Sequence, residues 1–185
     1  MTIDRWMSWE GGVDLAGSTI PGATQPNIIV HVARIVHTPI GSAPAGMILF
    51  QPDPAQAPLF MGFISTDLDV AAYFAPKIFA DTPFESAPTL AAKIRIDTSS
   101  LPDWISSHIS ISGYEIAVKF GNLGNLATID RAIGSPLPFS QQGLEATATD
   151  VSLTINGELV DMHLLPMGIT GGAAAVYSPA GIYAR

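Results

Sequence analysis

The chain has 185 residues, with 8 lysines and arginines against 16 aspartates and glutamates, which gives a formal net charge of −8. Because nucleic-acid affinity comes from clustered basic side chains, and here they are few and scattered, we expect no nucleic-acid partner. The same deficit disfavours anionic membrane surfaces, and no apolar run approaches the roughly 20 residues of a spanning helix. With no signal peptide visible and no cysteine for disulfides or thiolate chemistry, we expect a cytoplasmic protein without a membrane partner.

The small share of charged residues predicts self-association. Charged residues make up 13 % of the chain, against roughly 25 % in an average soluble protein. A surface so poor in charge favours burial of part of it in a homo-oligomer, and a long ligand cavity is the competing explanation. The length suits a single domain over residues 1–185.

In chain order, residues 1–26 carry glycines, two tryptophans and a Pro-rich end, and we interpret them as an irregular N-terminal arm. Short runs rich in β-branched and aromatic residues follow and predict strands. A helical spacing of apolar residues interrupts them at about residues 67–80 and predicts one short helical insertion. Residues 121–142 are rich in Gly, Asn, Pro and Ser, so we expect a long loop there, in which only residues 126–129 suggest a strand. The predicted strands lie at residues 27–38, 47–51, 59–65, 90–97, 109–120, 151–163 and 173–178.

Many short strands separated by turns, with one helical insertion, predict a mainly β protein: an antiparallel β-barrel or β-sandwich. A barrel is slightly favoured, because several strands have a second face that is neither plainly polar nor plainly apolar, as expected for a face that lines a lumen. Two turns are the clearest local signals. The alternation of apolar residues changes phase at Ser112-Gly113, and Asn156-Gly157 lies between two alternating runs.

The turn at Asn156-Gly157 fixes a register and with it a candidate site. Pairing outward from the turn places Asp150 opposite His163 and Ser152 opposite Asp161 on the mostly polar face of the hairpin. Asp150 or Asp161 could then orient the imidazole of His163 for acid–base chemistry, with Ser152 within reach as a nucleophile. The alternative is that these residues form only the hydrated face of an exposed hairpin.

Metal and cofactor chemistry is less well supported. Asp161 and His163 share a face of their strand, but a third ligand would have to come from His31 or Asp150. The glycine-rich segments lack the lysine and the strand-to-helix setting of a phosphate-binding loop. We therefore predict no metal and no cofactor.

The strand at residues 27–38 supplies two candidate ligand-binding residues. Arg34 lies among valines on its face and could hold an anionic group or neutralise a buried acid. His31 lies on the other face. The favoured hypothesis is a domain that binds a small apolar or weakly anionic molecule in a barrel-like cavity lined by this strand and the Asp150 hairpin. The alternatives are a small-molecule enzyme that uses the His163 and Asp pair, and a structural homo-oligomer subunit without a ligand.

Overall fold

The structure of the protein, a computed structural model, describes residues 5–134 and 137–185. It is mainly β, with one short helical insertion where the sequence predicts it. In the described part of the chain, no helix has the length and apolar character needed to cross a membrane. The elements are β1 (Trp6–Ser18), β2 (Ile28–Thr38), β3 (Gly41–Phe50), β4 (Phe60–Ser65), α1 (Leu68–Tyr73), the π-helical turn η1 (Phe74–Ile78), β5 (Thr89–Ala91), β6 (Lys93–Asp97), β7 (Trp104–Ile111), β8 (Tyr114–Leu123), β9 (Ala127–Arg131), β10 (Ser140–Ile155), β11 (Glu158–Leu159), β12 (His163–Leu164) and β13 (Ala175–Ala184).

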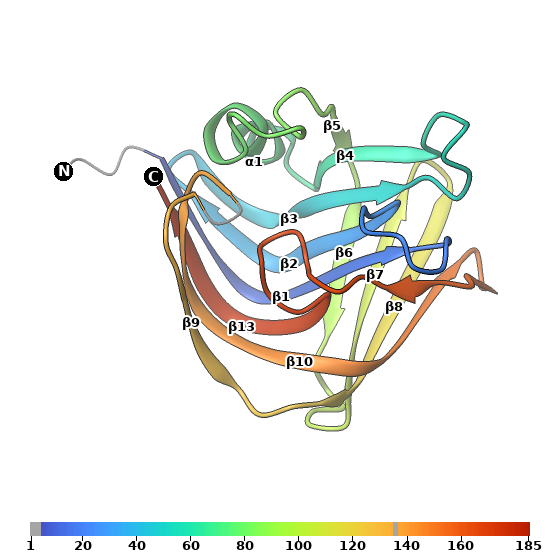
Figure 1. Ribbon diagram of the computed structural model, residues 1–185. Helices are drawn as coiled ribbons and strands as arrows, with labels where there is room; N and C mark the ends of the chain where they lie inside the picture. The colour runs from blue at the N-terminus through green and yellow to red at the C-terminus, as the bar shows by residue number, and fades with distance from the viewer. Residues whose placement is uncertain (1–4, 135–136) are drawn as a thin grey trace.

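The strands form one sheet that curls into a nearly closed barrel (Figure 1). Along the sheet the order is β5-β4-β3-β2-β1-β13-β10-β8-β7-β6, and all neighbours are antiparallel except β4 and β5. The two end strands, β5 and β6, are separated in the chain by Ala92 alone. In Figure 1, β6, β7 and β8 run steeply across the curved strands β1, β2 and β3, and β6 packs against β2 and β3. The barrel alternative is therefore the correct one.

The barrel interior is filled with side chains. Apolar residues from most strands of the sheet alternate inward and pack into one core, so the interior is not an open lumen. Its buried members include Val13, Leu15, Val30, Val32, Ile48, Ile94, Ile105, Val118, Phe120 and Leu153.

A second core lies on the outer face of β1 to β4, where the helical insertion covers the sheet. Asp67 caps the N-terminus of α1, because its carboxylate accepts hydrogen bonds from the backbone N–H groups of Asp69 and Val70. The turn η1 follows and brings Phe74 and Ile78 down onto the sheet. Phe63 of β4 stacks on Phe74 with ring centroids 5.8 Å apart, so the insertion is held by aromatic packing.

Strand β1 contributes to both cores because its alternation changes phase. Met7 and Trp9 belong to the outer core, whereas Val13 and Leu15 belong to the barrel interior. The change occurs next to Gly11, which has a φ of +62°. Glycine adopts this backbone conformation readily, whereas it is strained for most other residues. As a result, Asp14, which alternates with the inward-facing Val13 and Leu15, lies on the same side of the sheet as Trp9.

Two sequence expectations are wrong. The irregular arm expected over residues 1–26 contains β1, a strand of 13 residues at the centre of the sheet. The glycines that suggested irregularity instead make room for neighbours: a Cβ on Gly12 would lie 2.9 Å from Cδ1 of Trp9. The long loop expected over residues 121–142 contains the end of β8, all of β9 and the start of β10, and only β9 overlaps the strand suggested at residues 126–129. These strands are largely exposed, so they carry polar residues typical of loops.

Candidate functional site

The hairpin predicted around Asn156-Gly157 is present near its turn. Both turn residues have positive φ, 52° and 82°, as a two-residue hairpin turn requires. Ile155 pairs with Glu158, as predicted. The apolar face is also confirmed, because Val151, Ile155, Val160 and Met162 pack against the barrel core and Leu153 is part of it.

The predicted register holds as far as Val160, whose backbone N–H donates to the carbonyl of Leu153. Farther from the turn it is wrong: His163 pairs with Ser18 of β1, and no ladder among the described residues joins His163 to Asp150. The segment after the turn separates from β10, and its residues His163 and Leu164 form backbone pairs with β1 instead.

The four hairpin residues therefore do not form the predicted cluster on one strand pair. Asp150, Asp161 and His163 are exposed, and Ser152 is half-buried. The acid–base role of these residues stays a prediction. Across residues 5–134 and 137–185, no group of three His, Asp or Glu side chains is placed to hold a metal ion.

Arg34 is exposed and lies in an ion cluster. Its Nη2 is 3.2 Å from Oε2 of Glu10, and both side chains are about half exposed. The other oxygen of Glu10 lies 3.2 Å from Nε2 of His37. The guanidinium that could have held an anionic ligand thus has a carboxylate partner in solvent.

His31 lies at a cavity between the outer face of the sheet and the helical insertion. The cavity has a volume of about 30 Å³, which exceeds the roughly 10–15 Å³ that a cavity needs to hold one water molecule. The walls are mainly apolar and include Met7, Met47, Phe63, Phe74 and Phe79; the polar groups at the cavity are Asp14, His31, Gln141, Glu145, Thr170 and Ser178, with Trp9 and Tyr183. Met7 and Met47 are flexible, so the cavity can adapt to a larger guest.

Asp14 and His31 meet at this cavity across two neighbouring strands. They are direct partners in the β1–β2 ladder, and Oδ1 of Asp14 lies 3.4 Å from Nδ1 of His31. Both atoms are buried, yet neither has a hydrogen-bond partner among the described residues, because the contact lacks hydrogen-bond geometry. Asp14 is only 5 % exposed. A buried carboxylate oxygen without a hydrogen-bond donor is costly, so a donor placed at Oδ1 of Asp14 would be favoured.

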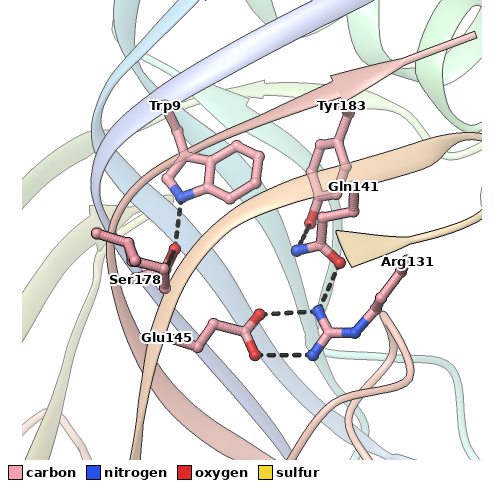
Figure 2. Close-up of polar contacts among 7 residues, drawn as sticks. Trp9, Arg131, Gln141, Glu145, Ser178 and Tyr183 are labelled. Carbon is pink, nitrogen blue, oxygen red and sulfur yellow. Dashed lines mark hydrogen bonds and ion pairs between the residues drawn. The ribbon is translucent and has the colours of Figure 1, made fainter. Parts of the chain in front are cut away.

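A satisfied polar network surrounds the pair (Figure 2). Arg131 of β9 binds Glu145 of β10 through two hydrogen bonds of 2.9 and 2.7 Å, and its Nη1 also donates to Oε1 of Gln141 at 2.6 Å. The amide of Gln141 donates in turn to Oη of Tyr183 at 3.2 Å. These contacts lock Tyr183 and Gln141 in place, so the wall around Asp14 is preorganised.

Three charged groups act on Tyr183 at the cavity: the carboxylates of Asp14 and Glu145 and the guanidinium of Arg131. Burial, reinforced by the two carboxylates, raises the pKa of Tyr183 well above its usual value. The pKa of Arg131 is also raised, first by its hydrogen bond to Glu145. Tyr183 therefore stays neutral and Arg131 charged.

We expect the substitution Tyr183→Phe to reduce the loss of stability at alkaline pH. The ordinary pKa is 10.0; above it the unfolded chain releases this proton while the folded chain keeps it, so stability falls as pH rises. One proton corresponds to about 1.4 kcal/mol per pH unit. Urea unfolding on both sides of pH 10 measures the slope; identical slopes for wild type and variant would contradict it. Tyr177, whose pKa burial also raises, is unchanged in both proteins.

Gly181 positions the indole of Trp9. A Cβ at residue 181 would overlap the six-membered ring of Trp9, whose Nε1 donates to Oγ of Ser178 at 2.9 Å. We expect Gly181→Ala to displace the indole and to lower the free energy of unfolding by about 1 to 3 kcal/mol. Gly124→Ala is the matched control, because its Cβ would lie no closer than 3.6 Å to any neighbour. Equal effects of the two substitutions in urea unfolding would refute this role.

Comparison of the chain with protein-family models, curated proteins and solved structures found no match. The candidate site therefore rests on the geometry above. Of the residues at the cavity, sequence reasoning identified only His31. The missed signal was Asp14, a charge between Val13 and Leu15, which reads as a buried or paired acid once residues 6–18 are recognised as a strand.

Proposed function

We propose that the protein binds a small, mostly apolar molecule in the cavity between the outer face of the sheet and the helical insertion. One observation carries the proposal: apolar walls converge with a few fixed polar groups around a buried carboxylate oxygen of Asp14 that has no hydrogen-bond donor among the described residues. Such a combination is typical of ligand sites.

The proposal places the ligand differently from the sequence hypothesis. Side chains fill the barrel interior, so the outer core replaces the lumen as the binding region. The expected weakly anionic character rested on Arg34, which is paired with Glu10 at the surface. Binding of a small apolar molecule is the part of the hypothesis that the cavity supports.

The test is a titration with isopropanol, a small and mostly apolar probe, followed by amide chemical shifts in NMR spectra. We expect saturable shifts in β1, β2 and η1. The variant Ala33→Leu, which adds volume at a cavity wall, should abolish them. The control Ala87→Leu adds the same volume to the outer core away from the cavity and should retain them. Shifts that are absent, or equal in both variants, would count against the proposal.

We also propose that the protein self-associates. Large apolar side chains are exposed on several elements, among them Ile40, Leu59, Ile133, Leu159 and Met167. With so few charges to cover the rest, part of this surface suits an interface between copies of the chain. Light scattering coupled to gel filtration should report a mass at least twice that of one chain. A single-chain mass across a wide concentration range would contradict it.

A further inference from the structure

We propose that the ligand of this cavity is a small alkylammonium cation, held by Asp14 and the surrounding aromatic rings. The inference rests on the proposed function and names its ligand class. It starts from the charge balance: Asp14 and Glu145 carry two negative charges, Arg131 carries one positive charge, and both Nη atoms of Arg131 bind Glu145. Asp14 has no guanidinium or ammonium partner among the described residues; its ion-pair neighbour is Nδ1 of His31, which lies 3.4 Å from Oδ1 without hydrogen-bond geometry.

Burial makes this imbalance matter. The side chain of Asp14 is 7 % exposed, and its Oδ1 has no hydrogen-bond donor among the described residues. A buried carboxylate needs a paired cation or donors to offset the loss of hydration. An ammonium group supplies both, because it carries one positive charge and several N–H donors.

The walls suit the alkyl part of such a ligand and add attraction for its charge. The rings of Trp9 and Tyr183 lie with centroids 4.6 Å apart, and the ring of Tyr183 lies 6.4 Å from that of His31, the ladder partner of Asp14. Aromatic faces attract ammonium groups, and more strongly where water is excluded. Met47 and Phe63 line the cavity and would shield the alkyl part of the ligand from water.

Other ligand classes fit less well. An anion would lie beside two carboxylates, while the guanidinium of Arg131 is already engaged by Glu145. A metal ion would find Asp14 and His31 but no third ligand, since no cluster of three His, Asp or Glu side chains occurs in the described residues. A neutral alcohol fits the walls but leaves the charge of Asp14 unbalanced.

The test compares isopropylammonium with isopropanol, which share the same carbon skeleton, by NMR titration of the full chain. We expect isopropylammonium to bind at least tenfold more tightly and to shift the amides around Asp14 and His31. Asp14→Asn should remove this preference while changing the affinity for isopropanol less than threefold. Asp161→Asn, which neutralises an exposed carboxylate, is the control for general attraction of cations and should keep the preference.

The outcomes separate the two proposals. If isopropanol binds in the cavity and isopropylammonium binds no more tightly, the ligand class is wrong and the binding function stands. If Asp161→Asn weakens the ammonium as much as Asp14→Asn does, the preference is general electrostatics and the inference is overturned. If neither probe shifts the cavity amides, the binding function itself fails. The wild-type comparison decides the matter even if Asp14→Asn does not fold.

Discussion

Substitution of Arg131 by methionine should lower the free energy of unfolding by about 3 to 5 kcal/mol. The side chains of Arg131 and Glu145 are only 17 % and 10 % exposed, and they share two hydrogen bonds. Without the guanidinium, both carboxylate oxygens of Glu145 lose the donor that the structure gives them, and Gln141 loses its own. The cost is mainly that of leaving a buried charge without a partner.

Two controls identify that cause. The double variant Arg131→Met and Glu145→Met removes both charges and should recover most of the stability, because an apolar pair can replace a buried ion pair. Arg34→Met breaks the half-exposed pair with Glu10 and should cost no more than about 1 kcal/mol. Urea unfolding of the three variants measures the differences. If the double variant is as unstable as Arg131→Met, loss of packing explains the effect and the charge argument is wrong.

The second large effect is expected for Phe63→Ala. Phe63 is fully buried, stacks on Phe74, and has its ring centroid 5.2 Å from that of Phe79. Removing the ring should cost about 3 to 5 kcal/mol through lost contacts and the space left behind. Because these contacts hold the helical insertion on the sheet, amide hydrogen exchange over residues 68–80 should accelerate more than in the rest of the chain.

Phe120→Ala is the matched comparison. Phe120 is equally buried but belongs to the barrel core, away from the insertion. We expect a similar loss of global stability without selective exchange at residues 68–80. The two-core description would be contradicted if both variants loosened the insertion to the same extent.

What the sequence predicts correctly is local. The turns at Ser112-Gly113 and Asn156-Gly157 depend on a few adjacent residues, and each has the positive φ values such turns need. The helical insertion is likewise marked by its own apolar spacing, and Asp67 caps α1. From many such strands the mainly β fold follows.

What the sequence does not predict depends on distant strands. His163 leaves its expected partner because β1, far away in the chain, offers Ser18 as a ladder neighbour. The contact between Asp14 and His31 depends on how β1 and β2 align across the connection at residues 19–27, which is too long for its turn at residues 20–23 to fix the register. Arg131, which binds Glu145 of β10, lies in the segment whose composition resembles a loop. The candidate site is built from these nonlocal pairings, so only His31 could be found from the sequence.

A crystal structure under xenon pressure tests the central claim most directly, because xenon occupies accessible apolar space and its anomalous scattering locates it. The account predicts a xenon site in the cavity beside Met47 and Phe63, between the sheet and η1, and no site in the filled barrel interior. Xenon bound only inside the barrel, or absent from the cavity at a pressure where surface sites fill, would contradict it.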